Sequence, residues 1–243
     1  MIVLSIGMPR AGSGWFFNLT NDLMVAGGFQ DVHKVRSRYH LGKVLTEVNC
    51  NIGSFSLPRL SAVLLPAALG NSFTVKAHAG PTGYTKFLIR RRALTPTYIY
   101  RDPRDALLSA WEYGQRGLAE GRSNAFSFIQ DFETGLDFIL GYLHIWEMWM
   151  DVDGVLHSRY EDLLTSYESE TQRLVDFIGI NPEGVNVRKV LENYKPGTAN
   201  TGRKGLHFRH GRIGRFRQKM TGEQIFQLNQ TLAPYLEEMG YEI

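Results

Sequence analysis

Cysteine and long apolar runs are scarce in this sequence. The single cysteine, Cys50, excludes an intrachain disulfide and a zinc site built on several cysteines, and it is typical of a reducing compartment. No apolar run approaches the roughly 20 residues that a membrane-spanning helix needs. Met1 leads into an apolar stretch without the basic start of a signal sequence. We therefore expect a cytoplasmic protein without a membrane span, folded as a single domain over residues 1–243.

Acidic residues are scarce in one part of the chain. Residues 188–219 contain ten lysines and arginines but only one acid, Glu192, so this segment carries a charge of +9. The whole chain carries +3, which leaves −6 for the remainder. Such a segment is compatible with a nucleic-acid or membrane patch, a solvated tail, or one wall of a site for a small polyanion. Composition alone leaves these alternatives open.

Short runs rich in β-branched and aromatic residues alternate with helical patterns. Strands are predicted at residues 2–6, 72–76, 97–100 and 154–157. Helices are predicted from Trp15 onward and at residues 103–119, 126–150, 160–178 and 221–239. This alternation indicates a three-layer α/β fold, in which helices flank a central, mainly parallel sheet. Ligands bind beyond the carboxyl ends of the strands in such folds, so the residues that follow each strand are the first site candidates.

A glycine-rich turn follows the first predicted strand. Residues 7–14 place three glycines between a strand and a helix, a pattern that lets backbone N–H groups approach an anion at a helix N-terminus. The turn is P-loop-like, but it lacks the Walker A lysine, and its cation, Arg10, precedes Gly12 and Gly14. An ordinary turn with a helix cap explains the same glycines, and this alternative stays open.

The second predicted strand ends in Lys76 and His78. Residues two apart on a strand share a face, so the ammonium and the imidazole are expected to point into one site. Histidine is suited to accept a proton near neutral pH, and a lysine beside it stabilises negative charge on an oxygen. The alternative is a histidine without a functional role.

The third predicted strand is followed by Arg101, and Ser109 lies two turns into the next helix. A guanidinium and a hydroxyl are both suited to hold a terminal phosphate. The neighbouring Asp102, Arg104 and Asp105 are expected to cap the helix and to form ion pairs at its start.

These segments, in this order, resemble those of the PAPS-dependent sulfotransferases, which move a sulfuryl group from 3′-phosphoadenosine 5′-phosphosulfate (PAPS) to an acceptor. Residues 9–15 are similar to the family's 5′-phosphosulfate loop, and residues 76–78 resemble its Lys-Thr-His segment. Residues 101–109 resemble its 3′-phosphate motif, with the Arg and the Ser eight positions apart. Residues 160–162 are similar to its Tyr-Glu-Asp segment, whose tyrosine lies near the adenine.

The resemblance implies a role for each matching residue. It implies that His78 is the catalytic base and that Lys76 and Arg10 stabilise charge on the reacting oxygens. The residues implied to bind the donor are Arg10, Ala11, Gly12, Ser13, Gly14, Trp15, Arg101, Ser109, Tyr160, Arg209, His210 and Gly211. PAPS is then the donor, 3′-phosphoadenosine 5′-phosphate (PAP) the product, and no metal is required. For Trp15, packing of the first helix onto the sheet is an equal alternative to a contact with adenine.

The carboxyl-terminal part also carries the resemblance, with departures. Residues 208–217 are similar to the segment that closes over the 3′-phosphate in the family, and residues 203–205 are a second candidate for that contact. Arg215 and Phe216 stand where the family has Asp and Trp. In the first loop, Ala11, Ser13 and Gly14 replace residues that are commonly Ser, Thr and Thr in the family, so we expect one hydroxyl contact to the phosphosulfate to be missing.

The acceptor is the least defined part of the prediction. Residues 30–69 and 114–124 lie between the donor motifs and are expected to line its pocket, although ordinary core packing also explains their apolar members. Those members are Tyr39, Phe55, Leu57, Leu60, Leu64 and Leu65. We expect a small-molecule or glycan acceptor and no nucleic-acid partner. The competing predictions are a P-loop kinase and a non-catalytic binder of polyanions.

Overall fold

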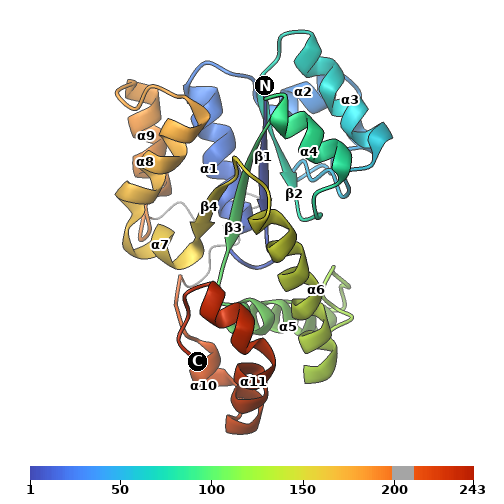
Figure 1. Ribbon diagram of the computed structural model, residues 1–243, viewed down its shortest axis with the longest axis vertical. Helices are drawn as coiled ribbons and strands as arrows, with labels where there is room; N and C mark the ends of the chain where they lie inside the picture. Colours follow the sequence, from blue (N-terminus) through green and yellow to red (C-terminus); the bar gives the residue numbers. More distant parts are fainter. Residues whose placement is uncertain (199–210) are drawn as a thin grey trace.

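Four parallel strands form the centre of the fold, in the order β2-β1-β3-β4. The strands are β1 (Ile2–Gly7), β2 (Phe73–Ala77), β3 (Leu94–Tyr100) and β4 (Leu156–Arg159). The computed structural model describes residues 1–198 and 211–243, and Figure 1 shows the sheet between helical layers. The predicted α/β fold with a parallel sheet and flanking helices is confirmed, and each of the four predicted strands is present within one to three residues of its expected bounds.

The strand β1 lies in the middle of the sheet and is buried along its whole length. Its side chains alternate between two cores, as a period of two requires. Leu4 belongs to the core on one face of the sheet and Val3 to the core on the other. Because all strands are parallel, their carboxyl ends meet at one edge, and the loops that follow them are brought together there.

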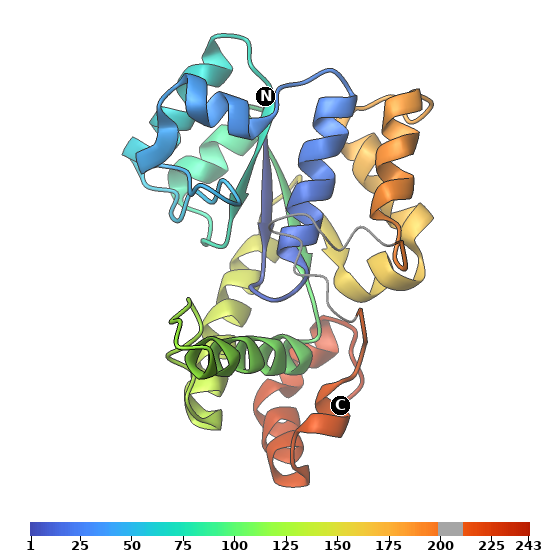
Figure 2. The ribbon, with the colours of Figure 1, turned by 180° about the vertical axis from the view of Figure 1, so that it is seen from behind.

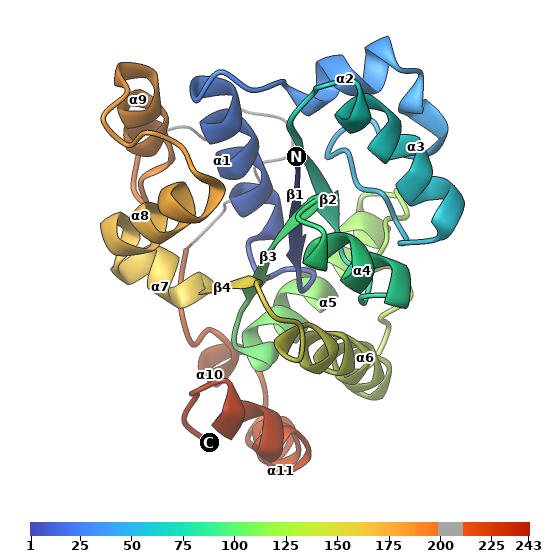
Figure 3. The ribbon, with the colours of Figure 1, turned by 45° about the horizontal axis from the view of Figure 1, so that its top comes forward.

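Helices cover both faces of the sheet (Figures 2 and 3). One face packs against α1 (Ser13–Ala26), α7 (Tyr160–Thr165), α8 (Tyr167–Ile178) and α9 (Val185–Tyr194). The other face packs against α2 (Val32–Arg38), α3 (Leu57–Ala68), α4 (Gly83–Arg90) and α6 (Phe132–Met150), with a short 3-10 turn, η1 (Leu41–Lys43), after α2. None of the helices in the described ranges is long and apolar enough to cross a membrane.

A third group of helices lies beyond the carboxyl edge of the sheet, at the lower end of Figure 1. It consists of α5 (Pro103–Ala119), α10 (Phe216–Lys219) and α11 (Gly222–Glu238). The predicted start of α5 is confirmed, since the Asp102 side chain accepts the N–H of Arg104 and Pro103 occupies the first turn. A capping box formed by Thr221 and Gln224 lies at the start of α11.

Two helix predictions were wrong at their boundaries. The helix expected from residue 126 begins at Phe132, because the Asp131 side chain accepts the N–H of Thr134 and caps the helix there. The helix expected over residues 160–178 is two helices, α7 and α8, which are separated at Ser166 by a non-helical backbone (φ −133°, ψ 44°).

Candidate functional site

The loops after β1, β2, β3 and β4 meet at the carboxyl edge of the sheet. His78 contacts the backbone of Gly7, and the Arg10 side chain contacts Ser109. The Arg101 guanidinium lies 4.6 Å from the centre of the Tyr160 ring. The segments singled out in the sequence therefore lie together in one site.

The turn after β1 depends on glycine at one position. Arg10 and Gly12 both have positive φ angles, 65° and 76°. A Cβ atom on Gly12 would lie 2.6 Å from Cδ2 of Tyr160, so both the backbone conformation and the close ring favour glycine. Gly12 is also the N-cap residue of α1 and provides no side-chain cap. The N–H groups of the first helical turn therefore receive no hydrogen bond from an N-cap side chain, as in loops whose helix N-terminus binds phosphate.

The imidazole of His78 is held in one tautomer. Its Nδ1 lies 2.6 Å from the carbonyl oxygen of Gly7. Because a carbonyl oxygen only accepts hydrogen bonds, Nδ1 carries the proton and Nε2 keeps a free lone pair. Burial, reinforced by the charge of Lys76, lowers the pKa of His78 to about 4. The ring is therefore neutral at pH 7 and able to take a proton at Nε2.

Lys76 is a buried cation without a carboxylate partner among the described residues. Its side chain is 5% exposed, and it forms no ion pair with any residue in the described part of the chain. Burial, together with the nearby charge of Arg10, lowers the pKa of Lys76 to about 8. An anion bound beside Lys76 would relieve this cost.

Arg10 connects the first loop to α5. Its Nε donates a hydrogen bond to Oγ of Ser109 at 3.2 Å, and its guanidinium lies 4.6 Å from the centre of the Tyr113 ring. Burial lowers the pKa of Arg10. The resemblance places Arg10 at the phosphosulfate and Ser109 at the 3′-phosphate. Their direct contact shows that the two predicted subsites adjoin.

Arg101 is nearly buried, with 7% exposure, and its hydrogen bonds with the described residues use only part of its donor capacity. Its Nη2 donates to Oδ2 of Asp105 and to the carbonyl oxygen of Arg212, both at 3.0 Å. Its Nε is buried and has no hydrogen-bond partner among the described residues. An orphaned buried N–H is uncommon in proteins, so this atom is suited to an acceptor on a bound ligand such as a phosphate.

The expected ion pairs at the start of α5 are confirmed. Asp102 pairs with Arg104 at 2.8 Å, and Asp105 pairs with Arg101 at 3.0 Å. No pattern in the sequence indicated that Arg104 also binds the carboxyl-terminal part of the chain. Its Nη1 and Nη2 donate to the Asn229 side chain and the Glu242 carbonyl, each at 2.8 Å. These partners lie 125 and 138 positions away, beyond the reach of a local pattern.

Trp15 is packed inside the protein. It is 5% exposed, it stacks on Tyr167 at 6.3 Å between ring centres, and its edge faces Tyr160. This position supports the packing interpretation, and a contact of Trp15 with adenine stays a prediction. Of the remaining loop residues, Ala11 and Ser13 are buried.

Only some of the carboxyl-terminal residues predicted to bind the donor lie within the described residues. Arg209 and His210 lie outside the described residues, as does the alternative at residues 203–205. Gly211 is described, with a φ angle of 53°.

Several cations of the basic segment are neutralised by carboxylates from elsewhere in the chain. The ion pairs are Arg188 with Glu183, Lys195 with Glu168, and Arg215 with Glu112.

The apolar residues predicted for the acceptor pocket have different surroundings. Phe55 and Leu60 are core residues, 2% and 0% exposed, whereas Leu57 and Leu65 are each 59% exposed. Tyr39 and Leu64 pack against the core from its margin.

A contact that the sequence did not reveal is the hydrogen bond from Nε1 of Trp149 to the carbonyl oxygen of Ala79, at 3.0 Å. It fixes the loop directly after His78 from the side of α6.

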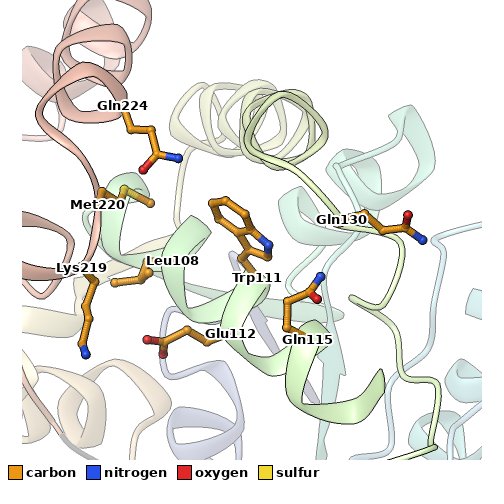
Figure 4. A pocket seen from close by; sticks show the side chains of 8 residues that line it. All are labelled: Leu108, Trp111, Glu112, Gln115, Gln130, Lys219, Met220 and Gln224. Carbon is orange, nitrogen blue, oxygen red and sulfur yellow. The ribbon is translucent and has the colours of Figure 1, made fainter. Parts of the chain in front are cut away.

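A cavity of about 460 Å³ lies next to the site, between α5 and the α10–α11 pair (Figure 4). Its lining combines the Trp111 indole with amide and charged side chains. The lining residues are Leu108, Trp111, Glu112, Gln115, Gln130, Lys219, Met220 and Gln224. Those from α5 recur at spacings of three and four and form one helix face, separate from the face that carries Ser109 and Tyr113.

Comparison with known proteins gives a match to one family. The model of the sulfotransferase domain matches residues 2–240. The structure is similar to mouse sulfotransferase SULT7A1 complexed with PAP, with a TM-score of 0.61, 15% identity, and coverage of 97% of this chain and 84% of that one. It is also similar to retinol dehydratase in a complex with retinol and PAP, with a TM-score of 0.59, 16% identity, and coverage of 100% and 82%. Comparison with curated protein sequences gives no match.

Proposed function

Since the chain belongs to the sulfotransferase-domain family, we propose that it transfers a sulfuryl group from PAPS to a hydroxyl acceptor and releases PAP. The observation that carries this proposal is the arrangement at the carboxyl edge of the sheet. A neutral His78 with a free Nε2 lies there beside Lys76, a buried cation with no carboxylate partner among the described residues. Similar folds crystallised with PAP support the choice of donor.

The donor is held by cations and backbone N–H groups in this proposal. Arg101, through an Nε that has no partner among the described residues, and Ser109 bind the 3′-phosphate. Arg10 and the N–H groups at the start of α1 bind the phosphosulfate. A hydrogen bond to a charged group contributes about 1.5–3 kcal/mol, so three or four of them offset much of the cost of removing the anion from water.

The transfer step is an in-line displacement at sulfur. The acceptor oxygen forms a bond to sulfur while the bond from sulfur to the 5′-phosphate oxygen breaks, and the electron pair leaves with PAP. His78 takes the hydroxyl proton at Nε2, a contribution of about 100- to 10,000-fold in rate. Lys76 and Arg10 stabilise the charge that develops on the bridging and leaving oxygens.

The acceptor is proposed to be a small molecule that carries a hydroxyl group. Retinol and androsterone occupy similar folds in solved structures. A glycan acceptor stays an alternative prediction. A single domain over residues 1–243 and a cytoplasmic location, both predicted from the sequence, belong to the same proposal.

A thermal-shift comparison tests the donor class. PAP is expected to raise the Tm, because a ligand at 100 times its dissociation constant stabilises the folded state by about 2.7 kcal/mol. ATP with Mg²⁺ and a DNA oligonucleotide, tested in parallel, are expected to have no such effect. Stabilisation by ATP with Mg²⁺ but not by PAP would instead favour a kinase, and strongly salt-dependent binding of the oligonucleotide would favour a polyanion binder.

Measurements of PAP release test whether His78 is the catalytic base. With PAPS and a panel of alcohols and phenols, the protein is expected to release PAP. His78→Ala is expected to abolish that release while PAP still binds. The matched control is His144→Ala, which alters an exposed histidine on α6 and is expected to leave both measurements unchanged. Turnover of His78→Ala at the wild-type rate would exclude His78 as the base.

A further inference from the structure

Asp105 joins the start of α5 to the carboxyl-terminal segment. Its side chain is fully buried. Oδ2 accepts hydrogen bonds from Nη2 of Arg101 at 3.0 Å and from the N–H of Gly214 at 2.8 Å, and Oδ1 accepts the N–H of Phe216 at 3.0 Å. One carboxylate therefore holds a side chain of the proposed 3′-phosphate site and the backbone of a segment more than 100 positions away.

The hydrogen bond with Asp105 fixes the orientation of the Arg101 guanidinium. Nη2 is engaged by Asp105 and by the Arg212 carbonyl, and the face of the group lies over the Tyr160 ring. The Nε atom of the group is left buried without a partner among the described residues. A free arginine side chain has rotamer entropy, which is lost when the side chain is ordered. Asp105 orders Arg101 before any ligand binds.

We propose that Asp105 is a positioning residue for the donor, which aims the Nε edge of Arg101 at the 3′-phosphate and anchors the backbone at Gly214 and Phe216 beside it. This inference rests on the proposed function, because it presumes that Arg101 binds a donor phosphate. Asp105 itself contacts neither donor nor acceptor in this proposal.

Two physical effects of Asp105 have opposite signs, and this makes the proposal testable. A carboxylate next to an anion site weakens anion binding through Coulomb repulsion, so its neutralisation alone would strengthen the binding of PAP. A positioning role predicts the reverse, because Arg101 and the 214–216 backbone lose their fixed places. The direction of the change therefore separates a positioning residue from a nearby charge.

The experiment is a calorimetric titration of PAP into the wild type, Asp105→Asn and a control, Glu170→Gln. Glu170 is also a buried carboxylate paired with an arginine, but it lies on α8, away from the site. In Asp105→Asn, one charge-assisted bond is lost and the amide N–H₂ opposes another donor, so PAP affinity is expected to fall about 10- to 100-fold. The KM for PAPS is expected to rise by a similar factor while kcat changes little, and Glu170→Gln is expected to match the wild type.

Two further variants test the positioning role of Asp105 independently. Asp105→Glu keeps the charge but moves the carboxylate by one methylene, so it too is expected to weaken PAP binding, and it provides the test if Asp105→Asn does not fold. In an Arg101→Ala background, Asp105→Asn is expected to add much less than it does alone. PAP binding by Asp105→Asn and Asp105→Glu at wild-type strength or tighter would overturn the proposal while leaving the proposed function intact. A wild type that does not bind PAP would overturn both.

Discussion

Raising the pH above 8 is expected to weaken PAP binding through the loss of one proton from Lys76. Burial near Arg10 lowers the pKa of this ammonium from 10.5 to about 8 in the ligand-free protein. A bound anion favours the charged form and raises the pKa again. Below pH 8 Lys76 is charged in both states, so the affinity is at its full value. Above pH 8 binding requires the uptake of a proton, and the affinity falls.

The expected magnitude follows from the linkage of protonation and binding. Between the two pKa values of Lys76, each pH unit costs a factor of ten, or about 1.4 kcal/mol. From the plateau below pH 7 to pH 9.5 the dissociation constant is thus expected to rise about 30-fold. The phosphate groups do not contribute to this change, because their second pKa is about 6. His78 does not contribute either, since its pKa of about 4 lies far below the range.

Isothermal calorimetry in two buffers of different ionisation enthalpy measures both quantities. At pH 9 the wild type is expected to take up close to one proton for each PAP bound. Lys76→Arg is the matched control, because a guanidinium stays charged over the whole range. This variant is expected to bind without proton uptake and with little dependence on pH. A wild-type affinity that stays constant to pH 9.5, or the same slope in Lys76→Arg, would refute the reasoning.

The remaining predictions concern residues that support the site. In urea titrations, Gly12→Ala is expected to lower the free energy of unfolding by at least about 1 kcal/mol more than Gly28→Ala does. Both glycines have positive φ angles, but only Gly12 has a ring within 4 Å of the added methyl group. Arg104→Met is expected to destabilise by about 3–5 kcal/mol through the buried charge that it leaves unpaired, whereas Arg122→Met, which removes an exposed ion pair, is expected to have little effect on the same measurement. Trp149→Phe loses the hydrogen bond to the loop after the proposed base, so it is expected to cost about 1–2 kcal/mol and to lower kcat more than PAP affinity; equal losses in both would contradict this role.

Local patterns in the sequence were sufficient for the strands and for several helix ends. The strand β1 is a run of apolar residues that ends at Gly7, and α5 begins where Asp102 and Pro103 predict. The start of α6 was placed too early, at residue 126 within a helical pattern, whereas the cap at Asp131 determines where the helix begins. A capping hydrogen bond therefore outweighed apolar periodicity at this boundary.

Only some of the contacts within the site could be predicted from the sequence. The order of the motifs predicted that Lys76, His78 and Arg101 lie at one edge of the sheet, because parallel strands bring their carboxyl ends together. The hydrogen bond between Arg10 and Ser109 spans 99 positions, and the bond between Trp149 and Ala79 spans 70. Such pairs depend on how helices pack across the sheet, and periodicity along the chain holds no information about that.

The distribution of charge shows why the density of cations along the chain is a poor guide to an anion site. In the basic segment 188–219, Arg188, Lys195 and Arg215 each pair with a carboxylate, so three of its nine net positive charges are neutralised in the fold. Lys76 comes from the part of the chain with a net charge of −6, and yet it is buried with no carboxylate partner among the described residues. An unpaired buried cation lowers stability, and selection retains such a cost where function requires it. The depressed pKa of Lys76 therefore locates the proposed donor site more sharply than the count of lysines and arginines does.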